Sequence, residues 1–482
     1  MFLHHLFRSW WCHAPLIVAA LCLSARAETP RAELGKRLRR FEIAWQEADG
    51  ERRAAAVAPM TAAVRSFFTL KLQAAAGHLD EAWFTVRSGA SPDLAERAAI
   101  ATAVTATPVL ADTTAETLAV EFEPFYEAAQ DGAAGAPARL RLSIVDRAGE
   151  TLAERAGDWA ETAGTIQWQT GPLPEGDLTL VVERLSDDPP IEIARIGLSR
   201  VERLRERLDA LATAANTWPE ATLPTARATV AAFLPLFKAL ADGRGQETDF
   251  PAARLLRFAE TLRAGRPTPS RTIAAAARDA DLWLTLSDGR GEVPVRLRAP
   301  ADATGPLPVL FLHHGAGGSE NMFFDTCGAG RAVTLGVERG WLVVAPRQGI
   351  FGLSLDVEGM LDILDDIFEI DRSRVFLIGH SMGAGQVAKQ VGLHPEAVAA
   401  AVALGGGAAA PAGEKAKRVP WFVAAGAADF GRPGAAALAK RLEAAGATVD
   451  FREYPDVEHM VIVQAALDDV FRFLDAVAAG RP

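Results

Sequence analysis

Cysteine is scarce in this sequence. The chain has 482 residues and only 3 cysteines. Cys12 and Cys22 lie within the first 27 residues, which leaves Cys327 alone in the rest of the chain. A lone thiol excludes a disulfide within the remaining chain and a metal site built from several cysteines. We predict no metal site and no cofactor.

Long apolar runs are also absent. No segment after the N-terminus reaches the ~18 uninterrupted apolar residues that a membrane-spanning helix needs. The first 27 residues combine Arg8, the short apolar stretch Ala14–Leu23 and the small-residue cleavage pattern Ala25–Arg26–Ala27. This order is typical of a signal peptide. We therefore expect export, and a chain without disulfides suits a bacterial periplasm or exterior.

The chain has fewer positively charged residues than negatively charged ones. The chain has 50 Lys and Arg against 61 Asp and Glu, a formal net charge of −11. Loss of the predicted signal peptide would remove two arginines and no acid. Such an acidic chain argues against binding of nucleic acid or of anionic membranes. The sequence leaves the oligomeric state open.

What is present indicates a globular chain of two or three domains, with 49% hydrophobic residues. Residues 28–107 are predicted to be helical, because Leu34, Leu38, Phe41 and Trp45 follow helical spacing. Residues 108–198 alternate apolar and polar positions and predict a small β-sandwich. Its role is left open between ligand binding and a spacer or packing partner.

A helical connector is predicted over residues 199–270. Ser199–Arg200–Val201–Glu202 matches a capping box and predicts a helix start at that point. Pro267 and Pro269 mark the boundary that follows. From 271 to 482, short apolar runs alternate with helical segments. This pattern predicts a doubly wound, mostly parallel α/β sheet.

One turn of the α/β region stands out. The apolar run Val375–Ile378 leads into Gly379–His380–Ser381–Met382–Gly383, and a helix-forming segment follows. Glycines on both sides of a serine let a strand and a helix pack closely, with the hydroxyl at the apex of the turn. Ser381 is the candidate nucleophile. The alternative is that Ser381 is an ordinary serine in a glycine-flanked turn, without a catalytic role.

A nucleophilic serine needs a histidine base and a carboxylate that orients it, in the chain order serine, acid, histidine. Only His394 and His459 follow Ser381, and His394 lies near the far end of the helix after the turn. His459, in a loop between the last strand and the last helix, is the predicted base. Asp429 is the preferred acid because it follows a predicted strand, and Asp456 is the alternative.

The third requirement is a set of backbone N–H groups that stabilise the negative charge of the tetrahedral intermediate. His314–Gly315–Ala316–Gly317–Gly318 follows a buried strand and supplies glycines for such a turn. We predict Met382 as one donor and Ala316 or Gly317 as the other. The segment lacks the lysine of a nucleotide-binding loop.

Together these motifs resemble the α/β-hydrolases, over residues 272–482. They are most similar to exported esterases of the dienelactone-hydrolase, feruloyl-esterase and polyhydroxybutyrate-depolymerase-like group, and more distantly to prolyl-oligopeptidase-type domains. The resemblance implies a catalytic triad of Ser381, Asp429 and His459 that acts on a small-molecule or polymer ester. A serine peptidase, or a non-catalytic envelope protein with a relic domain, remains the alternative.

The approach to the site is a further expectation. Only residues 405–418 separate the strands that end at Leu404 and begin at Val419, too few for an inserted helical lid. The pocket is therefore expected to be open, or covered by the N-terminal region. Arg347 and Gln348 follow another strand and are candidates for substrate contact or for ordinary surface positions.

Overall fold

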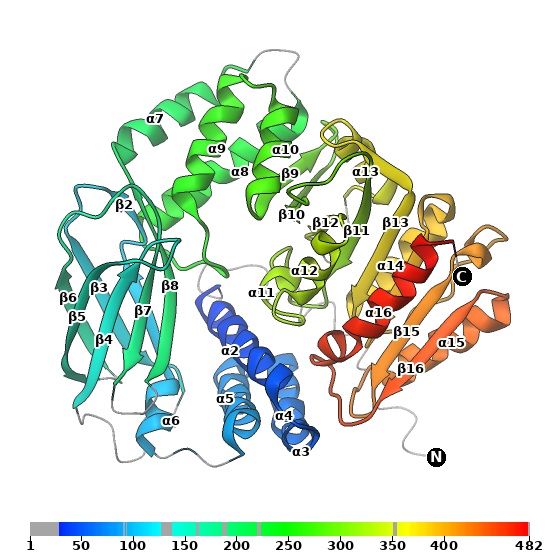
Figure 1. The fold of residues 1–482 in the computed structure, drawn as a ribbon, viewed down its shortest axis with the longest axis horizontal. Coiled ribbons are helices and arrows are strands. Elements are labelled where there is room, and N and C mark those ends of the chain that lie inside the picture. Colours follow the sequence, from blue (N-terminus) through cyan, green and yellow to red (C-terminus); the bar gives the residue numbers. More distant parts are fainter. Residues whose placement is uncertain are drawn as a thin grey trace.

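The computed structural model describes residues 28–480 apart from 90–91, 93, 127–136, 161–162, 186–189, 219–222 and 350–353. The predicted signal peptide, residues 1–27, lies outside this range. Figure 1 shows a β-sandwich on the left and an α/β domain on the right, joined across the top by helices. A second group of helices lies between them below. Within the described residues, no helix is long and apolar enough to cross a membrane.

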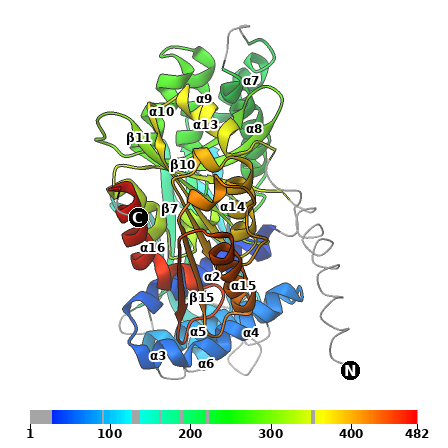
Figure 2. The ribbon, with the colours of Figure 1, turned by 90° about the vertical axis from the view of Figure 1, so that its right-hand side faces the viewer.

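The N-terminal helices form a small bundle. They are α2 (Glu28–Glu47), α3 (Gly50–Ala55), α4 (Val57–Phe68), α5 (Leu72–Ser88) and α6 (Leu94–Ile100). Asp49 caps α3 by accepting the N–H of Arg52 at 2.9 Å. Buried Phe41, Trp45 and Met60 belong to the same apolar cluster as side chains of the α/β domain. The bundle therefore shares its core with the α/β domain, and the views of Figures 1 and 2 agree in placing α2–α5 against its lower end.

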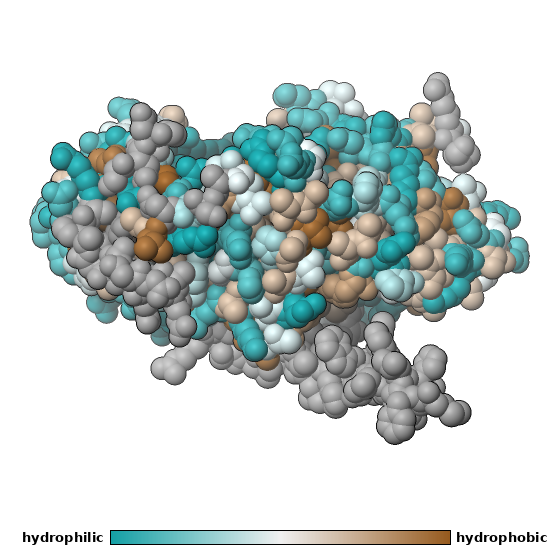
Figure 3. Space-filling model, turned by 90° about the horizontal axis from the view of Figure 1, so that it is seen from below, coloured by the Kyte–Doolittle hydropathy of each residue, from teal (hydrophilic) through white to brown (hydrophobic). Residues whose placement is uncertain are grey.

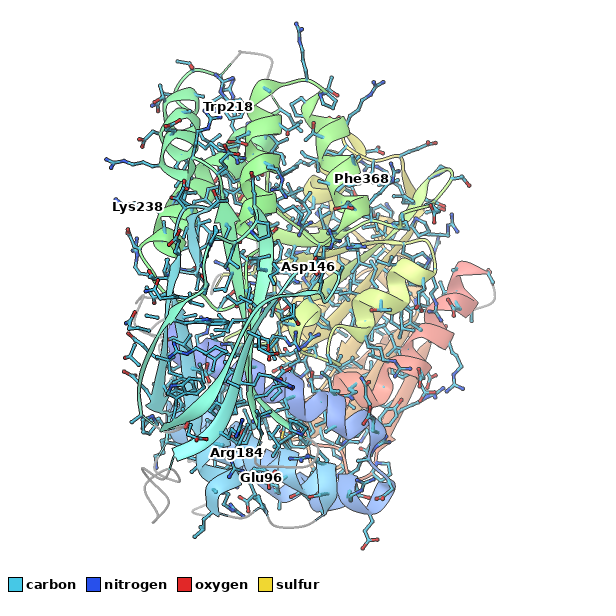
Figure 4. The ribbon with its side chains drawn as sticks, turned by 60° about the vertical axis from the view of Figure 1, so that its left-hand side comes forward. Glu96, Asp146, Arg184, Trp218, Lys238 and Phe368 are labelled. Atoms are coloured by element: carbon cyan, nitrogen blue, oxygen red, sulfur yellow. The ribbon has the colours of Figure 1, made fainter. Side chains whose placement is uncertain are left out.

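The sandwich consists of two sheets around one apolar core. One sheet has the order β1 (Thr102–Thr107), β3 (Thr117–Pro124), β6 (Gly164–Gln169). The other has the order β2 (Leu110–Asp112), β8 (Ile191–Val201), β7 (Gly176–Arg184), β4 (Pro137–Val145), β5 (Thr151–Ala160). Figure 4 shows Arg184 of β7 and Glu96 of α6 at the same end of the sandwich.

Two predicted boundaries differ from the structure. β1 lies inside the segment predicted to be helical, because its pairing with β3 buries Val104 and Ala106. The predicted capping box is wrong. Ser199 and Arg200 continue β8, and the helix begins only at Leu204. The Ser199 hydroxyl instead donates to Asp177 at 2.7 Å. Ser199 therefore remains in the sheet and does not cap a helix, although the local sequence pattern predicts a cap.

The connector helices are α7 (Leu204–Ala214), α8 (Pro224–Ala241), α9 (Ala252–Ala264) and α10 (Pro269–Asp279). Buried side chains such as Phe237 and Leu255 share one apolar cluster with the first strands of the α/β domain. The predicted boundary at residue 270 is thus a change of local pattern within a common core. In Figure 4, Trp218 and Lys238 mark the connector end of the molecule.

The α/β domain contains an eight-stranded sheet. In spatial order its strands are β16 (Val449–Tyr454), β15 (Trp421–Gly426), β14 (Ala400–Leu404), β13 (Ile370–His380), β11 (Leu307–His313), β12 (Leu342–Pro346), β10 (Glu292–Arg298) and β9 (Leu282–Ser287). Pairing is parallel from β16 to β12, whereas β10 pairs antiparallel with both of its neighbours, β12 and β9. Its helices are α11 (Met322–Asp325), α12 (Arg331–Glu338), α13 (Val357–Asp365), α14 (Met382–Leu393), α15 (Arg432–Ala445) and α16 (Ile462–Ala478).

The central strands are buried along their whole length. Burial on both faces explains why they read as continuous apolar runs in the sequence. Ligands of such sheets bind at the carboxyl ends of the strands. Here that edge holds the turns after β11, β13 and β15 and the loop after β16.

Candidate active site

Ser381 occupies a strained turn between β13 and α14. Its backbone has φ 56° and ψ −115°, a conformation that residues with a side chain rarely adopt. The Ser381 N–H donates to the Leu404 carbonyl of the adjacent strand at 2.8 Å. The surrounding sheet therefore holds the strained residue in place at the carboxyl edge.

Close packing on both sides of the serine demands glycine. A Cβ on Gly379 would lie 2.2 Å from the carbonyl oxygen of Gly383. A Cβ on Gly383 would lie 2.0 Å from the carbonyl oxygen of His313. Neither position can accept a side chain unless the strand and the helix separate. The two glycines of the motif thus have the structural role that the sequence predicted.

The structure brings the three predicted triad residues together. His459 Nε2 lies 3.0 Å from Ser381 Oγ, and His459 Nδ1 lies 2.7 Å from Asp429 Oδ1. Because a carboxylate only accepts, Nδ1 carries the proton and Nε2 presents its lone pair to the serine hydroxyl. His459 and Asp429 are both buried. This geometry suits proton transfer from Ser381 to His459.

The competing residues lie elsewhere. Asp456 is exposed on the loop before His459. His394 pairs with Asp356 at 2.8 Å, away from the serine. Glu458 is buried next to the triad, and burial raises its pKa to about 8, with the charge of Asp429 acting in the same direction. At neutral pH Glu458 is therefore mainly protonated, which avoids a second negative charge beside Asp429.

Two rings hold the imidazole of His459. The ring of His380 lies 4.8 Å away and that of Phe430 lies 4.1 Å away, measured between ring centroids. His380 Nε2–H donates to the His459 carbonyl at 2.9 Å. Burial, with the nearby His459 acting in the same direction, lowers the pKa of His380 to about 3. His380 is thus a neutral ring that positions the base, a role that the sequence pattern did not identify.

The glycine-rich loop after β11 lies beside the serine. A Cβ on Gly315 would come within 3.2 Å of Ser381 Cβ. Gly317 has φ +78°, a left-handed conformation that favours glycine. Met382 is the first residue of α14, so its N–H lies outside the hydrogen-bond ladder of the helix. Met382, Ala316 and Gly317 therefore remain the predicted donors to the oxyanion.

His314 and Gln348 brace this loop. His314 Nδ1 donates to the Gly315 carbonyl at 2.8 Å, and its Nε2 accepts the N–H of Gln348 at 3.0 Å. The Gln348 amide donates in turn to the His314 carbonyl. Burial lowers the pKa of His314 to about 4, so the neutral tautomer that these bonds require is the stable one at neutral pH. Gln348 is buried and supports the loop.

Arg347 behaves differently from its neighbour. It forms ion pairs with Glu320 and, at 3.3 Å, with Glu247. Glu247 also accepts the side-chain amide of Asn321 at 2.7 Å. Arg347 thus belongs to a polar network at the edge of the site.

A cavity of about 180 Å³ opens in front of Ser381. One side is the catalytic edge, with the loop Gly315–Ser319, His380 and His459. The other side comes from the N-terminal helices, including Met60, Val64 and Phe67 of α4. Of the two predicted alternatives, the pocket is therefore the covered one. Nothing in a single sequence indicated which face of α4 would meet the catalytic domain.

Among the described residues, no group of three or more His, Cys, Asp or Glu side chains is placed to hold a metal ion.

Comparisons with known proteins add structural similarities only. No protein-family model and no curated protein sequence matches the chain. An S-formylglutathione hydrolase from Agrobacterium tumefaciens is 15% identical, with 40% of this chain and 97% of that chain covered and a TM-score of 0.33. A fluorophosphonate-binding serine hydrolase from Staphylococcus aureus is 17% identical, with 40% and 98% covered and a TM-score of 0.34. A Pyrobaculum calidifontis esterase is 14% identical, with 44% and 90% covered and a TM-score of 0.32.

The chain's own topology carries the assignment. A mostly parallel sheet presents a strained serine turn after one strand, an aspartate after a later strand and a histidine after the last strand. Serine, acid and histidine follow one another in the order typical of one superfamily. Residues 282–478 therefore have the strand topology and the order of serine, aspartate and histidine of the α/β-hydrolase fold.

Proposed function

We propose that this protein is an exported serine hydrolase that cleaves carboxylic esters through an acyl-enzyme on Ser381. The observation that carries the proposal is the continuous hydrogen-bond chain from Ser381 Oγ through His459 to Asp429, with distances of 3.0 and 2.7 Å. A strained backbone at the serine supports it, because strain persists at positions where function requires it.

The proposed reaction begins with proton transfer. His459 Nε2 takes the proton of Ser381 Oγ as that oxygen attacks the ester carbonyl carbon. Asp429 accepts the Nδ1–H of His459 throughout and stabilises the imidazolium. The carbonyl π electrons move to the oxygen, which the N–H groups of Met382 and of Ala316 or Gly317 stabilise.

Collapse of this intermediate breaks the bond to the alcohol oxygen. The imidazolium returns its proton to that oxygen, and the alcohol leaves an acyl group on Ser381. Water then enters, His459 takes one of its protons, and hydroxide attacks the acyl carbon. Collapse of the second intermediate releases the carboxylic acid, and the proton on His459 returns to Ser381 Oγ.

The test uses purified mature protein and a matched Ser381→Ala variant. Both are incubated with p-nitrophenyl acetate and butyrate and, separately, with a fluorophosphonate probe. We expect turnover and covalent labelling of the wild type alone. Equal behaviour of the two proteins would refute the proposal.

A serine peptidase is the second candidate, because the same triad cleaves amides. The prolyl-oligopeptidase type would place a propeller of many repeated strands before the catalytic domain. The described part of the N-terminal half instead has a two-sheet sandwich and helices. Ester turnover with no cleavage of proline-containing peptide substrates would favour the esterase.

Export is the remaining part of the proposal and rests on residues 1–27 alone. Expression of the full chain in a Gram-negative host, followed by fractionation and N-terminal sequencing, tests it. The expected mature protein begins at Glu28. Recovery of the uncleaved chain in the cytoplasm would overturn this part and leave the esterase proposal untouched.

A further inference from the structure

Two N-terminal helices turn apolar stripes toward the catalytic serine. On α4, Met60, Ala63, Val64 and Phe67 recur at the spacing of one helix face and line the cavity in front of Ser381. On α2, Leu34 and Leu38 do the same. Figure 3 views the molecule from below and shows a surface where hydrophilic and weakly hydrophobic residues alternate, with only small strongly hydrophobic patches.

The contact between this bundle and the catalytic machinery is direct. The ring of Phe67 packs on the glycine-rich loop after β11, residues 314–318, which we call the oxyanion loop. The contact is so close that a Cβ on Gly317 would lie 2.8 Å from the Phe67 ring. Arg31 of α2 donates to the Gly317 carbonyl. Phe68 meets Phe430 edge to face with ring centroids 5.6 Å apart, and Phe430 lies on His459. The N-terminal helices therefore form one wall of the active site.

Of the described residues that line the cavity, three have Arg, Asp or Glu side chains, and each of these has an ion-pair partner. Arg31 pairs with Glu247 at 3.6 Å, and Asp325 pairs with Arg296 at 2.8 Å. Burial opposes ionisation of Glu247, but Arg347, Ser319 and Arg31 together hold its pKa below the usual value. These charges compensate one another, so the cavity favours a neutral group of the substrate over a charged one.

The volume of the cavity sets how large an apolar group it can hold. A dry apolar cavity of ~150 Å³ is known to hold a benzene molecule. A volume of about 180 Å³ thus fits an apolar group of roughly six to eight carbon atoms. Phe430, with 60% of its surface exposed, packs against Phe68, which lines the cavity.

We infer that the N-terminal helices are the specificity wall of the enzyme and that they bind a neutral apolar group of about this size on one side of the ester. The inference rests on the proposed function and adds a substrate class and the residues that select it. Met60, Val64 and Phe68 are the selecting side chains. They lie outside the α/β-hydrolase domain, in a segment with no catalytic motif of its own.

Two ester series test the inference with the mature full-length protein. One lengthens the acyl chain of p-nitrophenyl esters from acetyl to dodecanoyl, and the other lengthens the alkyl chain of acetate esters. Burial of one methylene contributes about 0.8 kcal/mol, which corresponds to about a fourfold rise in kcat/KM per carbon. We expect this rise in one of the series, up to six to eight carbons, and then a plateau.

Three variants assign the effect to the wall. Met60→Trp fills the cavity and should move the optimum of kcat/KM to acetyl or butyryl esters. Phe68→Ala removes one side chain of the wall and should reduce kcat/KM for the longest preferred ester at least threefold more than kcat/KM for acetyl esters. Arg65→Ala, on the exposed face of the same helix, is the matched control and should behave like the wild type.

The outcomes separate this inference from the proposed function. Turnover that depends on Ser381 but is flat in both series overturns the inference alone. A length preference that neither Met60→Trp nor Phe68→Ala alters also overturns it. Absence of any turnover that depends on Ser381 overturns the proposed function itself. If Met60→Trp fails to fold, Phe68→Ala, whose side chain is only partly buried, still decides the question.

Discussion

Glu42 of α2 is the clearest target for a quantitative prediction. Its carboxylate is fully buried where the N-terminal bundle meets the α/β domain. Oε2 accepts the N–H of Ala329 at 2.9 Å. Residues 327–330 all have positive φ, a run of turns that points successive N–H groups toward an anion. Among the residues that the structure describes, the other oxygen, Oε1, has no hydrogen-bond partner.

Burial raises the pKa of Glu42 from 4.5 to about 7, although backbone N–H groups and Arg39 oppose this shift. At Glu42 the folded protein therefore binds more protons than the unfolded chain between pH 4.5 and pH 7. The contribution of Glu42 to the free energy of unfolding must fall as pH rises through this window. At ~1.4 kcal/mol per unit of pKa, the loss amounts to about 3 kcal/mol above pH 7.

We predict that Glu42→Gln removes this loss, because glutamine resembles the protonated acid in shape and charge. The variant should match the wild type near pH 4.5 and exceed its free energy of unfolding by up to about 3 kcal/mol at pH 8. Urea denaturation followed by tryptophan fluorescence measures the difference at each pH. Glu47→Gln, on the exposed side of the same helix, is the control and should show no such trend. A difference between Glu42→Gln and the wild type that is the same at pH 4.5 and pH 8 would refute the reasoning.

The remaining predictions concern the catalytic domain. Asp429→Asn leaves the shape of the triad but disfavours the correct histidine tautomer, so kcat for p-nitrophenyl butyrate should fall by ~10⁴ with little change in KM; a loss below tenfold would contradict the assigned role. Gly383→Ala places a Cβ 2.0 Å from the His313 carbonyl oxygen and should lower the free energy of unfolding by about 3 kcal/mol or more. Gly385→Ala, in open space on the same helix, is the control and should leave the free energy of unfolding unchanged or raise it. Gln348→Leu removes the amide that holds the oxyanion loop and should lower kcat between about 10-fold and 100-fold at unchanged fluorophosphonate accessibility of Ser381; an unaltered kcat would show that the loop needs no such support.

The catalytic half follows closely from local sequence. Its central strands are buried on both faces, so each appears as an uninterrupted apolar run that can be located without knowledge of the partner strand. Gly379 and Gly383 indicate the tight turn in the sequence, because a side chain at either position would clash with the backbone. The order of Ser381, Asp429 and His459 reflects the topology of the sheet. Chain order selected His459, whereas Asp429 was preferred over Asp456 because it follows a predicted strand.

The sandwich edge was harder to predict. Ser199 and Arg200 match a helix cap locally, yet pairing with β2 and β7 keeps them in the sheet. Strand pairing between distant segments contributes hydrogen bonds that a local pattern cannot foresee. The start of the sandwich at Thr102 was missed for the same reason, because β1 is defined by its pairing with β3.

What the sequence by itself determined is the choice of Ser381, Asp429 and His459 as the candidate triad, since each of them sits after a strand end that local patterns reveal. Only the tertiary structure decided what surrounds that serine. The spacing of Met60, Val64 and Phe67 predicts a helix with one apolar face, and any apolar surface could satisfy it. The face meets the catalytic cavity because the bundle docks through Glu42 and Arg31 against loops almost 300 residues later in the chain, at residues 317 and 329. The hydrophobic effect is not directional, so the apolar face of the helix does not determine which surface it packs against. The tertiary contacts therefore decide whether the site is open or covered.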